Sequence, residues 1–302
     1  MASTLVLAFH LQGNVTGLSM IETDGPYGGY SCSNESHIHH HGEGDSVYMQ
    51  VRGQGDFYRE LRNKGFFINA PDDYFFQGTN KEGVGYNENQ FSLPRLEELV
   101  ITRSTLFEGT FIMPPTAVWS FVPLIAYHAG GGAASFWPPS QHIRDYELAL
   151  AMHMSFGIAA CYRGPGLYDT PAVRDMVKSW VDWFKLHRRV LTADIIHIRR
   201  ADGQAIDGIV HVDPRNAAGE IAMAAFFNPT TAAMTTTVLL PLYYAGVAPG
   251  ATVNVSHAEP AGALLAPPKS VPQTLTANYR SRVALDVEVA AGGYAMFLVR
   301  RG

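Results

Sequence analysis

Gly17-Leu-Ser-Met-Ile-Glu-Thr-Asp-Gly-Pro-Tyr-Gly-Gly29 is an apolar, strand-like run that ends in an acid, Asp24, and then enters a turn of glycine, proline and aromatic residues. Gly65-Phe-Phe-Ile-Asn-Ala-Pro-Asp-Asp73 repeats the pattern and opens into a second aromatic, glycine-rich loop. Barrels of alternating strands and helices keep their chemical groups at the carboxyl ends of the strands, where the loops surround a substrate. The two segments therefore predict two barrel strands that end in acids. The alternative is the commoner use of aspartate, as a helix cap or a turn former.

The composition is that of a globular chain large enough to bury a full core. Its 302 residues are 47% hydrophobic and 16% charged, which excludes a disordered chain and allows one large domain or two smaller ones. The net charge is −5 and the lysines and arginines are scattered, so nucleic acid is not an expected partner. No apolar run approaches the roughly 20 residues of a membrane span, so no membrane partner is expected. The two cysteines are too few for a disulfide framework, and the compartment stays open.

Two regions of different pattern divide the chain. Up to about residue 190, apolar runs alternate with helical patterns, which is typical of parallel α/β structure. From about residue 195, short alternating strands are separated by turn signals, which is typical of an antiparallel sandwich. The predicted fold class is therefore α/β plus all-β. It consists of a partial (β/α)8 barrel over residues 1–190, followed by an antiparallel β-sandwich over residues 191–302.

The first region contains too few units to close a barrel. The expected strands cover residues 18–23, 66–70, 117–126 and 156–161, and the expected helices cover residues 56–63, 93–107, 143–153 and 171–187. Asp169-Thr-Pro171 is a strong start signal for the last helix, because a capping residue precedes an early proline. These are about four strand–helix units, whereas a closed barrel needs eight. We therefore expect the carboxyl half of a longer barrel, whose amino-terminal half is missing from this chain.

The two acid loops together suggest a glycosidase-like carboxylate pair. A retaining mechanism needs an ionised nucleophile and a protonated acid about 5 Å apart. Asp24 is the expected nucleophile. The acid is expected among the acids of the second loop, with Glu88 preferred and Asp72 next; the full set is Asp72, Asp73, Glu82 and Glu88. For each of these four residues the alternative is a solvated loop acid.

Other side chains in the strand-end loops are candidates for substrate binding. Aromatic rings combined with polar groups suit sugars, which present apolar C–H faces. The glycine-rich turn Tyr127-His-Ala-Gly-Gly-Gly132 follows a strand and fits a backbone wall beside a substrate. Arg163 follows another strand, where it either holds a substrate hydroxyl or carboxylate or pairs with Asp169 to order its loop. The expected binding residues are Tyr27, Asp73, Lys81, His128 and Arg163.

His37-Ile-His-His-His41 is a histidine-rich run that invites a metal hypothesis. Consecutive histidines do not easily converge on one ion from an extended loop, and no partnered carboxylate or cysteine pattern accompanies them. The sequence therefore predicts no metal and no cofactor. The run is expected to line the cleft or to be solvated.

The chain resembles the carboxyl-terminal part of retaining glycoside hydrolases of the alpha-galactosidase type, which include the endo-alpha-N-acetylgalactosaminidases. The resemblance rests on Ile21-Glu-Thr-Asp-Gly25 as a nucleophile-strand end, on the acidic loop after residues 66–73, and on the order of half-barrel then sandwich. Phe226-Phe-Asn-Pro-Thr230 is similar to a sandwich core strand that runs into its turn. The resemblance implies cleavage of an α-linked, galactose-type sugar with retention, by two carboxylates and without a cofactor. It matches Asp24 to the nucleophile, whereas the family's Arg-then-Asp arrangement on a later strand is not visible here.

Two other function classes remain open. A non-catalytic carbohydrate-binding protein would keep the aromatic cleft and bind sugar without hydrolysis. A metal-dependent barrel hydrolase would bind an ion through His37, His39 or His40 and would lose activity on chelation.

Overall fold

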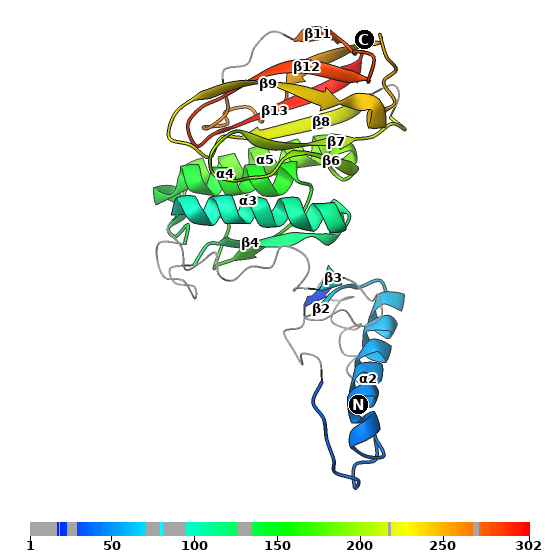
Figure 1. Cartoon of the computed structure of the whole chain (residues 1–302). Coiled ribbons are helices and arrows are strands. Elements are labelled where there is room, and N and C mark those ends of the chain that lie inside the picture. The colour runs from blue at the N-terminus through cyan, green and yellow to red at the C-terminus, as the bar shows by residue number, and fades with distance from the viewer. Residues whose placement is uncertain are drawn as a thin grey trace. The chain divides into compact units, whose positions relative to one another are not determined.

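The computed structural model describes residues 17, 19–22, 29–70, 79–80, 95–125, 135–216, 219–267 and 272–302. The chain divides into two compact units, Met1–Val84 and Gly85–Gly302 (Figure 1). Each unit has buried side chains of its own.

The described residues of the first unit form a small parallel sheet and a long helix. The core of this unit is formed by the buried side chains of Ile21, Tyr58, Leu61, Phe66 and Ile68. The sheet has the order β1–β2–β3, and both strand pairs are parallel. The elements are β1 (Met20–Glu22), α2 (Glu43–Asn63), β2 (Phe67–Ala70) and β3 (Thr79–Asn80).

Helix α2 begins at Glu43, well before residue 56, where the sequence pattern predicted its start. Gly53 and Gly55 weaken the helical signal in the sequence before residue 56, because glycine disfavours a helix interior. The carboxylate of Asp45 accepts hydrogen bonds from the backbone N–H groups of His41, at 3.0 Å, and Gly42, at 3.1 Å. These bonds satisfy donors at the helix start that have no partner within the helix.

The second unit begins with a layer of helices and one pair of strands. Strands β4 and β5 pair in parallel, with Trp119 opposite Ala159 and Pro123 opposite Arg163. The three helices lie between this pair and the antiparallel strands that follow (Figure 1). Thr170 caps α5, as the sequence predicted. Its hydroxyl accepts a hydrogen bond from the Val173 N–H at 3.4 Å, and Pro171 is the first residue of the helix. The elements are α3 (Arg95–Ile112), β4 (Trp119–Pro123), α4 (Ile143–Ser155), β5 (Ala159–Arg163) and α5 (Pro171–Leu191).

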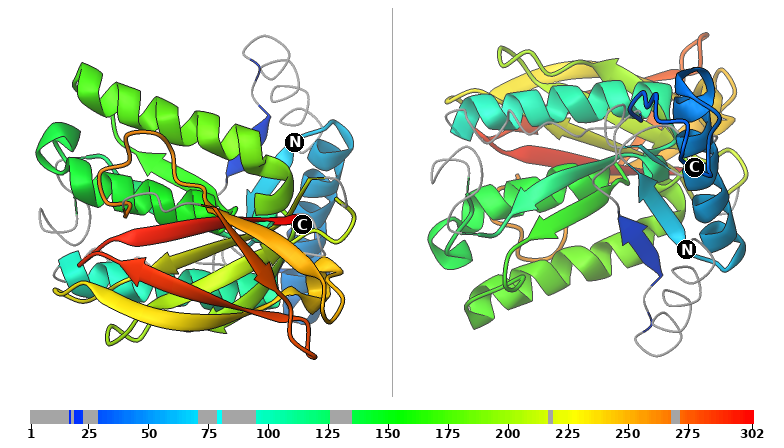
Figure 2. Two further views of the ribbon diagram at one scale, coloured as in Figure 1. Left: turned by 90° about the horizontal axis from the view of Figure 1, so that it is seen from above. Right: turned by 90° about the horizontal axis from the view of Figure 1, so that it is seen from below.

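Antiparallel strands make up the rest of the second unit. One sheet has the order β11–β10–β13–β8–β7–β6, and β12 pairs with β9 in another. Helix α5 packs beside β7 and β8, as the view from above in Figure 2 shows. The strands are β6 (Asp194–Arg199), β7 (Asp207–Val212), β8 (Glu220–Phe227), β9 (Met234–Pro241), β10 (Thr252–His257), β11 (Gln273–Thr276), β12 (Arg282–Val289) and β13 (Tyr294–Arg301).

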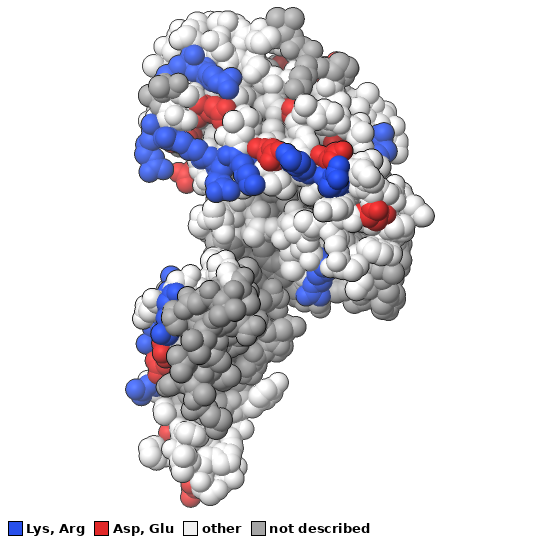
Figure 3. All heavy atoms as spheres, turned by 180° about the vertical axis from the view of Figure 1, so that it is seen from behind, with Lys and Arg blue, Asp and Glu red and all other residues white. Residues whose placement is uncertain are grey.

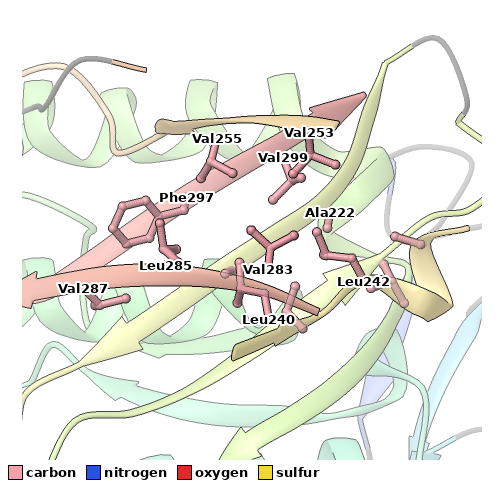
Figure 4. Close-up of a cluster of buried hydrophobic side chains, with 14 of the residues drawn as sticks. Ala222, Leu240, Leu242, Val253, Val255, Val283, Leu285, Val287, Phe297 and Val299 are labelled. Atoms are coloured by element: carbon pink, nitrogen blue, oxygen red, sulfur yellow. The ribbon is translucent and has the colours of Figure 1, made fainter. Parts of the chain in front are cut away.

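The two antiparallel sheets share one hydrophobic core. Along β12, buried and exposed residues alternate strictly, as expected for a strand with one face on a core. Its buried side chains meet those of β8, β10 and β13, as Figure 4 shows for Leu285 and Phe297. At about 25 cal/mol per Å² of apolar surface, burial of this kind is the main stabilising contribution to the layered arrangement.

The structure confirms a mixed helix-and-sheet fold with an antiparallel sheet in its carboxyl-terminal part. The change from helices to antiparallel strands falls between Leu191 and Asp194, while the domain division 1–190 and 191–302 stays a prediction. The described parallel strands belong to two separate sheets, so the partial barrel also stays a prediction. Among the described residues, none of the helices has the length and apolar character that crossing a membrane requires.

Basic and acidic side chains lie close together on the surface of the second unit. Figure 3 shows lysines and arginines next to aspartates and glutamates on one face. Ion pairs of the second unit include Arg174–Asp175 at 2.9 Å and Arg189–Asp213 at 2.8 Å. The charges of these two arginines are therefore locally compensated.

Candidate active site

The carboxyl ends of β1, β2 and β3 meet at one edge of the sheet in the first unit. Glu22, the last residue of β1, stands opposite Asn69 of β2, and Asn69 stands opposite Thr79 of β3. Because the strands are parallel and in register, the chain leaves all three at the same edge. Ile21 of β1 and Ile68 of β2 are 6% and 1% exposed, so their side chains pack the sheet onto the core of the first unit.

The predicted site residues follow these strand ends closely in sequence. Asp24 comes two residues after β1, Asp72 comes two residues after β2, and Lys81 directly follows β3. These residues lie outside the described part of the chain, as do the other candidates Tyr27, Asp73, Glu82, Glu88 and His128. The structure therefore places the strand ends from which the candidates emerge, and their roles stay predictions.

Arg163 is the one predicted site residue that the structure describes. It is the last residue of β5 and is partly buried, and its guanidinium lies over the ring of Phe121 with 4.1 Å to the ring centroid. A guanidinium over an aromatic face is held in place without losing its hydrogen-bonding edge. The role of Arg163 in binding a substrate stays a prediction.

Asp169 ends the loop that Arg163 begins. Its carboxylate accepts hydrogen bonds from Ser140, from the backbone N–H at 3.2 Å and from the hydroxyl at 2.6 Å. Burial acts to raise the pKa of Asp169, but the hydrogen bonds from Ser140 and from the backbone of Asp169 and Thr170 together hold that pKa below its usual value. Asp169 is thus tied to the segment before α4.

The loop that joins β1 to α2 is fastened to the first turns of the helix. Gln50 exchanges two hydrogen bonds with the backbone of Tyr30, at 3.2 and 2.7 Å. The N–H of Cys32 donates to the buried hydroxyl of Ser46 at 3.1 Å. Because these contacts lie about one helical turn apart, they fix the path of the loop along α2. This loop follows the proposed nucleophile in the chain and leads back from the edge of the sheet.

Glu147 is a buried carboxylate in the second unit that the sequence reading missed. It is 0% exposed, and it accepts hydrogen bonds from the Leu264 N–H at 2.8 and 2.9 Å and from the Tyr294 hydroxyl at 3.1 Å. The Trp180 indole N–H donates to it at 3.4 Å. Burial raises the pKa of Glu147, while the hydrogen bonds from Leu264, Tyr294 and Trp180 act to lower it.

A cleft of about 280 Å³ opens beside Glu147, lined by residues of α4, α5 and the loop before Leu264. A carboxyl with a raised pKa in a cleft has the profile of a general acid. In this case the carboxylate oxygens already accept bonds from three protein groups, so the arrangement fits a role in joining helices to sheet. The signal in the sequence is weak: Glu147 is the single acid in the apolar run Tyr146-Glu-Leu-Ala-Leu-Ala151.

A second cleft of about 420 Å³ lies between α5 and the strands β10 and β13. His257 is within 3.1 Å of Glu259, and the same oxygen of Glu259 accepts from the Met296 N–H at 2.7 Å. His187 lies 2.9 Å from Glu220, which also accepts from Arg300 at 3.2 Å. Both carboxylates are thus engaged in cross-links within the second unit, and the strand edge of the first unit remains the candidate active site.

No family model and no curated protein matches the sequence. Solved structures do match the fold. The GH36 alpha-galactosidase AgaA from Geobacillus stearothermophilus matches with a TM-score of 0.61 and 11% identity, over 100% of this chain and 38% of its own. AgaB, a GH36 alpha-galactosidase from the same organism, matches with a TM-score of 0.60 and 14% identity, over 100% of this chain and 38% of its own. A GH27 β-L-arabinopyranosidase from that organism matches with a TM-score of 0.53 and 8% identity, over 98% of this chain and 61% of its own.

The chain thus spans 38% of the length of the alpha-galactosidases that it matches. At these identities the likeness is one of fold. It confirms, for the fold, the resemblance to alpha-galactosidase-type glycosidases that the sequence motifs indicated, and a match to part of each enzyme is consistent with a carboxyl-terminal segment.

Proposed function

We propose that this chain carries the nucleophile half of a retaining glycosidase that cleaves an α-linked, galactose-type sugar. Asp24 attacks the anomeric carbon, and a second acid protonates the leaving oxygen and then activates water. The observation that carries the proposal is the parallel, in-register sheet whose strands β1, β2 and β3 end just before Asp24, Asp72 and Lys81.

The spacing of the strands supports a close pair of carboxylates. Neighbouring strands lie about 4.8 Å apart, and a retaining pair needs its carboxyl groups about 5–5.5 Å apart. Asp24 and Asp72 follow neighbouring strands at the same distance in sequence, two residues beyond each strand end. In the register of this pair Glu22 stands opposite Asn69, so Asp72 lies one position further along its strand than Asp24 does along its own. Glu88, which the sequence reading preferred, and Asp72 are therefore the two candidates for the second carboxylate that experiment must separate.

The comparisons support the class of substrate. Variants of AgaA were crystallised with stachyose and with raffinose, and the present chain shares their fold over its full length. Tyr27, Asp73, Lys81 and His128 are proposed to contact the sugar from the loops at the sheet edge, and Arg163 from the end of β5. In this proposal the carbohydrate is the partner, and the remaining barrel strands come from an amino-terminal half outside this chain.

The test is hydrolysis of an aryl α-galactoside by this chain, alone and in any longer protein that contains it. Asp24→Asn should abolish turnover while the far-ultraviolet circular dichroism stays unchanged. Loss of the acid should abolish glycosylation by an alkyl galactoside but spare glycosylation by a dinitrophenyl galactoside, since that leaving group needs no proton. Because the same residue activates water in the second step, azide is added as a nucleophile that needs no base. Comparing Asp72→Asn with Glu88→Gln on the two substrates identifies the acid. Asp56→Asn is the matched control, because Asp56 is an exposed acid on α2 that pairs with Arg59 at 2.9 Å.

Unchanged turnover by Asp24→Asn would refute the assignment of the nucleophile. Saturable binding of galactose without hydrolysis, in either context, would favour a non-catalytic carbohydrate-binding protein. That second function fits a chain that spans 38% of the enzymes that it matches.

A further inference from the structure

Three metal-ligating side chains converge in the loop between β1 and α2. The thiol of Cys32 and one ring nitrogen each of His37 and His40 all lie within 4.8 Å of one another. The shortest separations meet at Nδ1 of His37, which is 3.5 Å from Sγ of Cys32 and 3.1 Å from Nε2 of His40. The three residues are separated by four and by two residues in sequence.

We propose that Cys32, His37 and His40 form a binding site for one zinc-type divalent cation. With Zn–S near 2.3 Å and Zn–N near 2.05 Å, the edges of a tetrahedral site are about 3.6 Å from sulfur to nitrogen and about 3.3 Å from nitrogen to nitrogen. The observed 3.5 Å and 3.1 Å match these edges closely. Two of the three edges therefore fit an ion, and the third, from Cys32 to His40, is within 4.8 Å.

Turns bring the histidines together, which an extended loop would not do. The chain turns at residues 35–36 and again at residues 38–39, and the N–H of His37 donates to the Asn34 carbonyl at 3.4 Å. Each turn reverses part of the chain, so a ring nitrogen of His37 and one of His40 lie close together, and exposed His39 is not part of the cluster. The sequence expectation that the histidine run does not converge rested on an extended loop, and the turns remove that premise.

The backbone on both sides of the cluster is fixed before any ion binds. Cys32 is held by Ser46 at 3.1 Å, and the N–H of His41 is held by Asp45 at 3.0 Å. A site whose ligands are already ordered loses less conformational entropy on binding. The site would then cross-link the loop to itself at the start of α2, independently of the proposed glycosidase function.

The donor set selects the metal. One thiolate and two imidazoles suit Zn²⁺ and its spectroscopic substitute Co²⁺, whereas Mg²⁺ and Ca²⁺ prefer oxygen ligands. The thiol loses its proton on binding, so one proton is released to solvent for each ion bound. Three protein ligands leave a fourth position for a water molecule.

The contacts of Asn34 must change when the ion binds. The side-chain nitrogen of Asn34 lies 3.2 Å from Nε2 of His37, and its oxygen accepts from the N–H and the hydroxyl of Ser36 at 3.0 and 2.8 Å. With Nδ1 on the metal, Nε2 carries the ring proton, so the amide of Asn34 must turn its oxygen toward the ring and give up its bonds from Ser36. Ring nitrogens of metal-bound histidine are commonly satisfied by such an acceptor.

The experiment titrates the full chain, purified with chelator and without an affinity tag, with Co²⁺ and then displaces the cobalt with Zn²⁺. We expect one equivalent to bind, with the visible bands of tetrahedral cobalt and a thiolate-to-cobalt charge-transfer band in the near ultraviolet. Cys32→Ser should remove the charge-transfer band, and His40→Gln should weaken binding by about 100-fold or more, since changes to outer-shell partners alone cost 10- to 100-fold.

The matched control is His39→Gln/His41→Gln, which keeps the three proposed ligands and removes the other two histidines of the run. It should bind one equivalent with unchanged spectra. Loss of binding in this control, or cobalt spectra that Cys32→Ser leaves unchanged, would show that the histidine run binds metal like a tag and would overturn the site. Absence of stoichiometric binding to the folded wild-type chain would overturn it as well. Asp24→Asn should bind one equivalent of the ion with unchanged spectra. A failure of the metal site and a failure of the proposed hydrolase activity can therefore be told apart.

Discussion

Glu147 of α4 accepts a hydrogen bond from the hydroxyl of Tyr294 of β13, with 3.1 Å between the two oxygens, although the two residues are 147 positions apart in the chain. Both side chains are fully buried. Burial raises the pKa of Tyr294, and the neighbouring charge of Glu147 raises it further, so the tyrosine remains a donor. The bond joins the helical layer of the second unit to its antiparallel sheet.

The first prediction concerns pH. Burial raises the pKa of Glu147 in the folded chain, so the folded state binds this proton more tightly than the unfolded state does. The stability that protonated Glu147 contributes is then fully present below about pH 4.3, the pKa of glutamate in the unfolded chain. It is lost as the pH rises through the pKa of Glu147 in the folded chain. Glu147→Gln removes this titration while keeping an acceptor oxygen for Tyr294. Urea unfolding from about pH 4 to about pH 8 should show the variant gaining stability relative to the wild type as pH rises.

Glu147→Leu serves as the comparison for that experiment. It leaves the Leu264 N–H, the Tyr294 hydroxyl and the Trp180 indole without their acceptor, at a cost of about 1–3 kcal/mol for each buried group left unpaired. If the free energy of unfolding differs between Glu147→Gln and wild type by the same amount at every pH, the raised pKa of Glu147 is contradicted.

The second prediction concerns a buried ion pair between α3 and β7. Nε of Arg103 donates to both oxygens of Asp207, at 3.1 and 3.2 Å, and the two side chains are 3% and 4% exposed. Burial raises the pKa of Asp207, and the guanidinium of Arg103 partly offsets this. Arg103→Met should lower the free energy of unfolding by about 3–5 kcal/mol, because it leaves a buried carboxylate without its partner.

The double variant Arg103→Met/Asp207→Leu tests whether the loss comes from the unpaired charge. Replacing both members of a buried pair by apolar side chains is often neutral or stabilising, so most of the lost stability should return. A double variant that is as unstable as the sum of the two single variants would show that packing, and not the unpaired charge, sets the cost.

The third prediction concerns the start of α5. Thr170→Ala removes the acceptor for the Val173 N–H and should lower the free energy of unfolding by about 1 kcal/mol. Thr170→Ser keeps the hydroxyl and should stay close to wild type. Urea unfolding followed by tryptophan fluorescence reports on this helix, since Trp180 and Trp183 both belong to it. Equal losses for Ala and Ser would mean that the methyl group, and not the cap, stabilises this end.

Secondary structure with strong local signals could be predicted from the sequence. The predicted helix over residues 171–187 is observed as Pro171–Leu191, and the short alternating strands predicted beyond residue 195 include the one observed as Arg282–Val289. A capping residue with an early proline, or strict alternation, depends only on neighbours in the chain. The first turns of α2 could not be predicted, because two glycines weaken the local signal and contacts to the preceding loop supply the stability.

The candidate site was predictable in part. The motifs at residues 20–24 and 67–72 located two strand ends, and the parallel pairing of β1 and β2 brings those ends to one edge. The sequence alone did not reveal the setting of Glu147, because its donors come from α5, β13 and a distant loop.

By itself, the sequence determined the order of the elements, the change from helices to antiparallel strands after Leu191, and the acids that follow the first strands. Periodicity and turn chemistry encode these locally, within a few residues. Only the tertiary structure decided which distant groups meet: Glu147 with Tyr294, Arg103 with Asp207, and the loop of Cys32, His37 and His40 along α2. Such encounters depend on sheet pairing and helix packing, whose energy comes from surfaces that are far apart in the chain.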